Sequence, residues 1–366
     1  MFSSILVFLL VLSILVVVHE LGHFIVARKM GILVEEFGFG LPPRIFSKKI
    51  GETVYSINLL PFGGFVRLHG ETTEEGVAHP RRAFLNKSKK VRAAVVVAGV
   101  IMNFILGVVA FGIVYSFLGI PRETNQVKVV EIATGSPAQS AGIIVGDSIK
   151  SVDKKEVTTV GAFVSLIEEK KGKRTTVELL RDSETKNITL TPRDAPPENE
   201  GPLGVVITTT EIYFPPYWQR PFIGVYYGFN EALLWGGRIV EGFVKIFRDL
   251  FVGVAPKDIA GPVGIFAITT QAAKGGILEL ISFIGILSVN LAILNIIPFP
   301  ALDGGRLAFI GLETFLGKRV LPKIEAIVHT VGMVILLLAL LAITAQDIRG
   351  LIKAGSLSNF VEGVLK

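Results

Sequence analysis

The sequence predicts a multi-pass α-helical membrane protein with about four transmembrane helices, a membrane-associated β-hairpin or sheet, and one compact α+β domain outside the membrane. Half of its 366 residues are hydrophobic and the mean hydropathy is +0.59, which is too high for an ordinary soluble protein. Runs without a charged residue occupy 1–18, 93–120 and 280–302, and a nearly pure aliphatic run occupies 331–345. Each run approaches the roughly 20 residues that a helix needs to cross the hydrocarbon core of a bilayer.

The first apolar run leads directly into the motif H-E-L-G-H at 19–23. Positions four apart share one face of a helix, so His19 and His23 can bind one metal ion together, and Glu20 lies beside them as a candidate general base. This pattern is typical of zinc peptidases, and ionisable residues at membrane depth usually have a function. No basic residue precedes the apolar run and no small-residue cleavage site follows it, so we expect the segment to be retained rather than removed as a signal peptide.

Basic residues set the expected orientation in the membrane. Lysine and arginine are frequent between 28 and 92, and the positive-inside rule places that segment in the cytoplasm and 121–279 outside. The net charge of +6 therefore indicates membrane topology and contact with anionic lipids rather than nucleic-acid binding, for which the sequence carries no motif. The absence of cysteine excludes disulfide bonds and cysteine ligands or nucleophiles.

Between 34 and 67, apolar and β-branched residues are interrupted by glycine and proline, which is a pattern of short strands and turns. The segment is either a plain cytoplasmic hairpin or a sheet that dips toward the active site. Exposed apolar patches mark contact sites, so the sheet is favoured by four apolar side chains, Phe37, Phe39, Phe62 and Phe65.

The second apolar run carries Gly99, Asn103 and Gly107 at i, i+4 and i+8. Small residues at this spacing allow another helix to pack closely. Asn103 is then either a packing residue or a polar group near the metal cleft.

Residues 126–210 alternate β-rich runs with two helical segments, which predicts a compact domain. The strings G-S-P-A-Q-S-A-G-I at 135–143 and G-D-S-I at 146–149 resemble a bacterial PDZ domain. The string L-G-V-V at 203–206 resembles the ligand-binding edge, placed last as in circularly permuted members. PDZ domains bind extended peptides or chain ends by adding a strand, and here peptide binding and mere exclusion of bulky substrates are both open.

After this domain, apolar residues recur at helical spacing between 222 and 252, with charged residues interleaved. Such charges would be costly in hydrocarbon. We therefore expect an amphipathic helix on the membrane surface rather than a fifth span.

A catalytic zinc ion usually has three protein ligands, so a third ligand must come from elsewhere in the chain. Asp303 is the best candidate, because it ends the charge-free run 280–302 and two prolines before it break the helix at membrane depth. Asp303 could instead cap the helix that starts after it, but the intramembrane H-E-x-x-H motif favours a ligand. The weaker candidates are His329, a packed or snorkelling histidine, Asp347 and Glu279, which lie at the ends of spans, and Glu313 and Glu325, which look like solvated loop acids.

Two motifs together, H-E-x-x-H at 19–23 and N-x-x-P-x-P-x-L-D-G at 295–304, resemble those of the site-2 proteases, which are intramembrane zinc metalloproteases. The resemblance is closest to the bacterial regulator-of-sigma-E protease group, whose members also place a PDZ domain outside, between spans two and three. Further matches at 37–40 (F-G-F-G), 62–65 (F-G-G-F) and 261–264 (G-P-V-G) extend the resemblance over nearly the whole chain. Several members carry two PDZ domains, whereas this chain has room for a single one.

The resemblance implies that His19, His23 and Asp303 hold Zn²⁺ and that Glu20 is the catalytic base. This assignment agrees with the roles that the residue types and their spacing suggest. The resemblance also implies that Asn295 hydrogen-bonds the backbone of the substrate.

A transmembrane substrate must unwind before its peptide bonds can be cut, and the freed backbone groups are costly in hydrocarbon unless they are paired again. A sheet edge can pair them by strand addition. We therefore hypothesise that the region 37–66 clamps the substrate, with contacts from Phe62, Gly63 and Phe65.

The expected organisation has four parts. They are an N-terminal catalytic membrane part at 1–120, the PDZ domain at 121–210, an amphipathic membrane-surface segment at 211–276 and a C-terminal catalytic membrane part at 277–366. The resemblance implies the bacterial cytoplasmic (inner) membrane, with the PDZ domain on the extracytoplasmic side. The implied partners are the lipid bilayer and transmembrane substrates, either anti-sigma-factor-like single-span proteins or remnant signal peptides.

Two other functions stay open from the sequence. A membrane scaffold could bind peptides through its PDZ domain and carry an inert motif, in which case it would hold no stoichiometric zinc. A transporter also uses intramembrane acids and broken helices, but this sequence has no inverted repeat and few spans.

Overall fold

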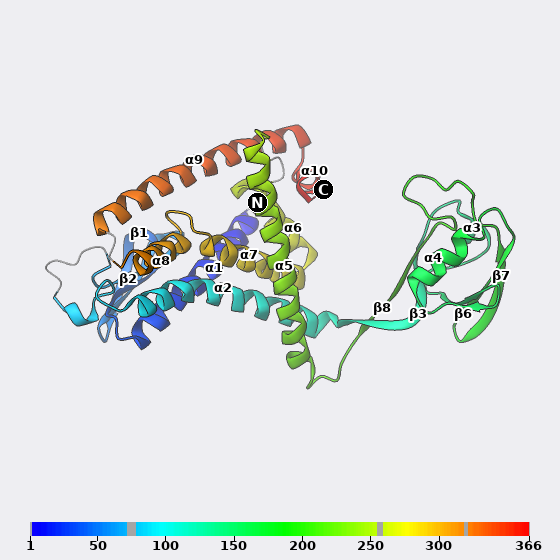
Figure 1. Cartoon of the computed structure of the whole chain (residues 1–366), viewed down its shortest axis with the longest axis horizontal. Helices are drawn as coiled ribbons and strands as arrows, with labels where there is room; N and C mark the ends of the chain where they lie inside the picture. The colour runs from blue at the N-terminus through cyan, green and yellow to red at the C-terminus, as the bar shows by residue number, and fades with distance from the viewer. Residues whose placement is uncertain (1, 72–77, 255–258, 318–320, 366) are drawn as a thin grey trace. The chain divides into compact units, whose positions relative to one another are not determined.

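The computed structural model describes residues 2–71, 78–254, 259–317 and 321–365 (Figure 1). The chain forms two compact units. The first, called the helical unit here, comprises Met1–Phe117 and Tyr217–Lys366. The second, called the sheet unit, comprises Leu118–Pro216.

Four helices of the helical unit are long and apolar enough to cross a membrane. They are α1 (Phe2–Lys29), α2 (Lys89–Leu118), α7 (Ile277–Ile296) and α9 (Pro322–Ala354). Their apolar parts coincide with the four runs found in the sequence. The prediction of about four helices of membrane-spanning length is therefore confirmed.

The first two of these helices approach each other backbone to backbone beside the H-E-x-x-H motif. A Cβ atom on Gly22 of α1 would lie only 2.4 Å from the Ala98 carbonyl oxygen of α2, so only glycine fits at this position. Apolar side chains continue the contact toward the end of α1, where Ala27, Val95 and Val96 belong to one buried cluster.

A small sheet follows α1 in the chain and is built by two long antiparallel strands, β1 (Val34–Ile50) and β2 (Thr53–Leu68). The first half of β1 is paired on both of its sides, since Gly38 opposes Ser56 on one side and Phe65 on the other. The order of segments across the sheet is therefore 44–50, 53–58, 36–39 and 64–68. The segment 64–68 forms one edge of this sheet.

This edge of the sheet lies against α1. The Ser13 hydroxyl of α1 donates a hydrogen bond to the Pro61 carbonyl oxygen at 2.8 Å, and a Cβ atom on Gly64 would lie 3.6 Å from Cγ of Glu20. The expected strands and turns over 34–67 are present. The sheet lies next to the H-E-x-x-H motif. A plain hairpin in the cytoplasm would lie away from this motif.

The remaining elements of the helical unit are α5 (Arg220–Phe251), α6 (Pro262–Gly275), α8 (Asp303–Leu316), α10 (Leu357–Leu365) and a 3₁₀ turn at Pro80–Arg82. α5 presents a stripe of buried small residues, Gly224, Gly228, Ala232 and Gly236. A Cβ atom on Gly228 would lie 2.5 Å from the Val108 carbonyl oxygen, so α5 packs closely on α2. α5 is not among the helices apolar enough to span a membrane, which agrees with the expected amphipathic helix, and its position on the membrane surface stays a prediction.

A buried ion pair joins α8 to the start of α2. Glu313 of α8 is 2% exposed and pairs with Arg92, which is 3% exposed. The Lys89 ammonium group donates a second hydrogen bond to the Glu313 carbonyl oxygen at 2.7 Å. The expectation that Glu313 is a solvated loop acid is therefore wrong, because its partner comes from a helix more than two hundred residues earlier in the chain. Breaking such a pair on one side would leave an uncompensated buried charge.

The sheet unit contains α3 (Pro137–Ser140), α4 (Val160–Glu168) and six strands, β3 (Ile120–Ile132), β4 (Ser148–Val152), β5 (Lys155–Glu156), β6 (Thr175–Arg181), β7 (Glu184–Leu190) and β8 (Val205–Tyr213). Their order is β7-β6-β4-β3-β8, with β5 paired to β4. The apolar core is self-contained, and its fully buried members include Val127, Val177 and Leu179. β8 therefore forms an edge of the sheet, paired with β3 alone among the described strands.

One buried carboxylate holds the loop before β4. Asp147 accepts hydrogen bonds from the Ile144 N–H at 2.9 Å and from Nε and Nη2 of Arg181 at 2.7 Å. Burial by itself raises the pKa of the Asp147 carboxyl group, but the hydrogen bonds and the positive charge of Arg181 outweigh that effect. The pKa of Asp147 therefore lies below the ordinary aspartate value.

We expect Asp147→Asn to destabilise the sheet unit by about 2 kcal/mol at neutral pH, because charge-assisted hydrogen bonds in a buried place are lost. The contribution of Asp147 is present above the ordinary aspartate pKa of about 3.9 and is lost as the pH falls through the lower pKa of the folded protein. Denaturant unfolding of the excised sheet unit at pH 7 and in acid measures the difference between wild type and variant. Asp182→Asn, at an exposed neighbour of Arg181, is the control and should be neutral; a difference for Asp147→Asn that persists in strong acid contradicts the explanation.

Candidate metal centre

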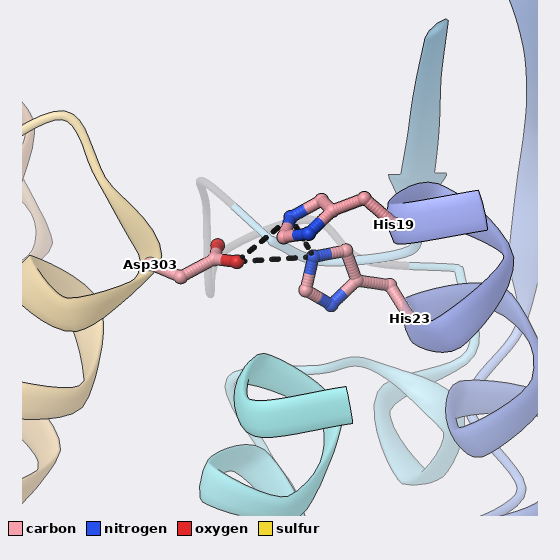
Figure 2. Close-up of side chains that lie close together, drawn as sticks. All are labelled: His19, His23 and Asp303. Atoms are coloured by element: carbon pink, nitrogen blue, oxygen red, sulfur yellow. Dashed lines mark hydrogen bonds and ion pairs between the residues drawn. The ribbon is translucent and has the colours of Figure 1, made fainter. Parts of the chain in front are cut away.

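Three side chains from the second half of α1 and the start of α8 converge. His19 and His23 lie on one face of α1, and their Nε2 atoms are 3.1 Å apart. Oδ2 of Asp303, the first residue of α8, lies 3.0 Å from the His19 Nε2 and 3.2 Å from the His23 Nε2 (Figure 2). Among the described residues, these three are the one group of three or more His, Asp or Glu side chains that offers ligand atoms within 4.8 Å of one another.

The glycines after Asp303 allow the chain to turn tightly between α7 and α8. A Cβ atom on Gly304 would lie 2.1 Å from the Ile297 carbonyl oxygen, and one on Gly305 would lie 2.5 Å from the Phe299 carbonyl oxygen. Any larger residue would push the loop away from the first turn of α8. The loop could therefore not carry Asp303 to the histidines without these two glycines, a role that the sequence reasoning did not assign to them.

Helix α9 supports the same loop from its other side. The Ala301 N–H donates a hydrogen bond to Nδ1 of His329 at 2.9 Å, and Ala301 has a left-handed backbone with φ of 76°. A Cβ atom on Gly332 would lie 2.3 Å from Cβ of Pro300, so α9 and the loop are in direct contact. The structure thus places His329 outside the three converging residues, as a partner of the loop that precedes Asp303.

The three residues fit a zinc ion. Tetrahedral zinc with bonds of about 2.0 Å separates its ligand atoms by about 3.3 Å, close to the 3.0, 3.1 and 3.2 Å measured between these atoms. Two imidazole nitrogens and one carboxylate oxygen are also ligand types that zinc prefers in catalytic sites. Within the described part of the chain, Oδ2 of Asp303 is buried without a hydrogen-bond donor, as expected for an atom that faces a cation.

The converging residues open on a cavity of about 340 Å³. Besides the three candidate ligands, it is lined by Glu20, Phe65, Val66, Arg306, His329 and Met333, among others. Arg306 forms an ion pair with Glu71, which lines the same cavity. The cavity is therefore polar around the histidines although it lies between membrane-length helices, and it is large enough to hold several water molecules.

The residues expected to contact substrate are distributed unevenly around this cavity. Phe65 lines it, and Gly63 lies on the same strand, in a left-handed conformation with φ of 89° beside Leu41. Asn295 lies in the last turn of α7, is half-buried, and is not among the residues that line the cavity. The side chain of Phe62 lies outside the described part of the structure.

An H-E-x-x-H motif on a membrane-length helix, facing an aspartate from the start of a distant helix, is the arrangement of a membrane-embedded zinc metalloprotease. The chain belongs to peptidase family M50, the site-2 protease family, whose model matches residues 7–339.

Relatives of known name agree with this assignment. The chain is 30% identical to the zinc metalloprotease RasP of Oceanobacillus iheyensis, over 95% of this chain and 99% of the relative. It is 33% identical to a Clostridium acetobutylicum protein named provisionally as a zinc metalloprotease, over 95% of this chain and 98% of the relative. A similarly named Clostridium perfringens protein is 35% identical over 93% of this chain and 97% of its own length. The protein is a zinc metalloprotease of the membrane, and Zn²⁺ is its cofactor.

We expect Asp303→Asn to weaken zinc binding by more than roughly 100-fold, since even the loss of an outer hydrogen-bond partner of a ligand costs 10- to 100-fold. An amide oxygen is neutral and binds zinc poorly compared with a carboxylate. Metal analysis of the protein purified in detergent, together with competition against a chelator, measures the effect. Glu279→Gln removes an acid from the first turn of α7 and should leave the zinc content unchanged. Stoichiometric zinc in Asp303→Asn would contradict the assignment of this ligand.

Proposed function

We propose that the protein is an intramembrane protease that hydrolyses peptide bonds within transmembrane segments of its substrates. His19, His23 and Asp303 are the zinc ligands of the proposal, and Glu20 is its proton-transfer group. One observation carries the proposal: three ligand atoms and Glu20 meet in one polar cavity between helices of membrane-spanning length. A soluble protease would have no need to place its active site between helices of membrane-spanning length.

The proposed chemistry is hydrolysis of an amide bond. When bound, zinc polarises the peptide carbonyl group and lowers the pKa of water toward neutrality. The Glu20 carboxylate takes a proton from the attacking water, whose oxygen forms a bond to the carbonyl carbon. Glu20 then passes that proton to the leaving nitrogen as the carbon–nitrogen bond breaks. Its position on α1, directly after His19, keeps its carboxylate at the cavity that holds the ligands.

The proposed substrate is a single-span membrane protein or a remnant signal peptide, because both present an apolar helix within the bilayer. Such a helix must be unwound, and its freed N–H and C=O groups need new partners. The edge segment 64–68 is suited to this task, since Phe65 and Val66 line the cavity and Gly64 lies beside Glu20. Strand addition along this edge would bring an unwound peptide past the three ligands. The clamp formed by 37–66, with contacts from Phe62, Gly63 and Phe65, is part of the proposal.

The sheet unit is the proposed PDZ domain. Its edge strand β8 starts at Val205, within the expected ligand-binding string L-G-V-V at 203–206, and α4 packs against that strand. An edge strand beside a helix is the arrangement that PDZ domains use to add a peptide strand. The domain would either bind peptide ends or exclude bulky substrates before cleavage.

The proposed location is the bacterial cytoplasmic (inner) membrane, with the sheet unit on the extracytoplasmic side. The abundance of lysine and arginine between α1 and α2 supports this orientation. The proposed catalytic parts are 1–120 and 277–366, separated by the PDZ domain at 121–210 and the amphipathic segment at 211–276. The limits of the sheet unit, Leu118–Pro216, lie close to the proposed limits of the PDZ domain.

We expect Glu20→Gln to bind zinc like the wild type and to lose cleavage by a factor of at least 10² to 10⁴, the usual contribution of general acid–base catalysis. The assay uses protein purified in detergent and a model single-span substrate, with metal content measured in parallel. Cleavage at the wild-type rate by Glu20→Gln would remove Glu20 from the mechanism. A membrane scaffold with an inert motif would show neither stoichiometric zinc nor any cleavage by the wild type.

We expect Asn295→Leu to keep its zinc but to slow cleavage of the same substrate, because a hydrogen-bonding group toward the unwound backbone is lost. Leucine has the same number and branching of side-chain heavy atoms as asparagine, and Asn295 is half-buried, so the end of α7 should stay packed. Unchanged cleavage would refute the substrate-binding role of Asn295. That outcome would also agree with its position outside the residues that line the cavity.

A further inference from the structure

We infer that one face of α2 orients the two histidine rings for metal binding, with Asn103 as the residue that positions His19. The inference rests on the proposed zinc site. Val95, Gly99 and Asn103 follow one another at i, i+4 and i+8, so they share one face of α2. All three of these residues contact or closely approach the rings of His19 and His23.

The two rings lie almost perpendicular to each other, at 86°, but they present the same nitrogen to each partner. Their Nε2 atoms face Asp303 (Figure 2), and their Nδ1 atoms face α2. Nδ1 of His23 lies 2.8 Å from the Val95 carbonyl oxygen. Since a carbonyl oxygen only accepts hydrogen bonds, Nδ1 of His23 carries the hydrogen and Nε2 keeps its lone pair toward Asp303. A backbone group of α2 therefore fixes the tautomer that a metal ligand needs.

His19 needs the same arrangement, and the side chain of Asn103 is in place to provide it. For Nε2 to keep its lone pair, Nδ1 of His19 must carry the hydrogen and find an acceptor. The Asn103 amide faces this nitrogen, with Nδ2 at 3.4 Å. Asn103 is 0% exposed, and its Oδ1 atom has no hydrogen-bond partner among the residues that the structure describes.

The two ends of an asparagine amide are assigned from their hydrogen-bond partners. In the present orientation, the Asn103 Nδ2 donor faces the His19 Nδ1–H, which is also a donor. Turning the Asn103 amide by half a turn places the acceptor Oδ1 opposite the His19 Nδ1–H. The same turn moves Oδ1 out of a buried position where it lacks a partner. The backbone at this point is held from α7, because the Ser288 hydroxyl donates a hydrogen bond to the Asn103 carbonyl oxygen at 2.7 Å.

Gly99 provides the space that brings the rings within reach of these groups. A Cβ atom at this position would lie 2.6 Å from Cε1 of His19 and 2.6 Å from Nε2 of His23. Even a methyl group would therefore push both rings off α2. The rings would then move away from Val95 and Asn103, and their Nε2 atoms would no longer converge with Asp303.

Gly107, two helical turns further along α2, offers a matched control. A Cβ atom there would lie 2.6 Å from Cγ2 of Val289 on α7, which is as close as the contact at Gly99. Both variants therefore add a methyl group to α2 that meets a neighbour at the same distance. Gly99→Ala crowds the histidines of α1, whereas Gly107→Ala crowds Val289 of α7. A role of α2 in helix packing alone predicts equal effects of the two variants on zinc binding.

The test measures the zinc affinity of the full-length chain in detergent by competition with a chelator, and the visible absorption spectrum after loading with Co²⁺. Asn103→Leu removes the acceptor but keeps the number and branching of the side-chain heavy atoms, and it should weaken zinc binding about 10- to 100-fold. Asn103→Asp keeps an acceptor and should bind zinc close to the wild-type affinity. Gly99→Ala should lose at least as much affinity as Asn103→Leu and alter the Co²⁺ spectrum, whereas Gly107→Ala should change neither.

Three results would overturn the inference: wild-type zinc affinity in Asn103→Leu, equal losses in Asn103→Asp and Asn103→Leu, or equal losses in Gly107→Ala and Gly99→Ala. Circular dichroism checks that each variant is folded, and Asn103→Ala replaces the leucine variant if that protein does not fold. Absence of zinc from the wild type would instead refute the proposed metal site itself. Zinc in the wild type with unaffected variants would refute only the role assigned to α2.

Discussion

Close backbone contact between α1 and α2 determines where the histidine side chains can lie. Gly22 brings α1 onto the Ala98 carbonyl group, and Gly99 leaves room for the rings on the facing side of α2. Lipid chains are as apolar as the side chains they replace, so packing of small residues is a main source of association between membrane helices. The same small residues thus hold the helices together and set the orientation of the two rings.

The other half of the site depends on pairing polar groups away from water. Asp303 is carried by a broken helix, whose irregular backbone must find partners inside the protein. Just before Asp303, His329 accepts a hydrogen bond from the Ala301 N–H. The Arg92–Glu313 ion pair holds α8, the helix that begins with Asp303. A charged residue alone at this depth would be costly, so each of these partners also keeps Asp303 in the position from which it reaches the histidines.

Much of this organisation could be predicted because its signals are local in sequence. Charge-free runs indicated the membrane-length helices, the four-residue spacing of His19 and His23 indicated a shared face, and two prolines before an acid indicated Asp303. The pairing of Glu313 could not be predicted, because its partner Arg92 lies in another helix and the spacing of residues within one helix does not show which distant residue they contact. The loop contact of His329 and the two-sided pairing of 36–39 likewise depend on tertiary contacts that leave no periodic pattern.

The sheet unit leaves and rejoins the chain at neighbouring positions, because Ile120 at its start is paired with Tyr213 at its end. A unit whose two ends are paired in this way behaves as an insertion, since its length can change while its two ends stay together. The sheet unit can therefore be lengthened, exchanged or duplicated while the helices around Asp303 and the two histidines stay as they are.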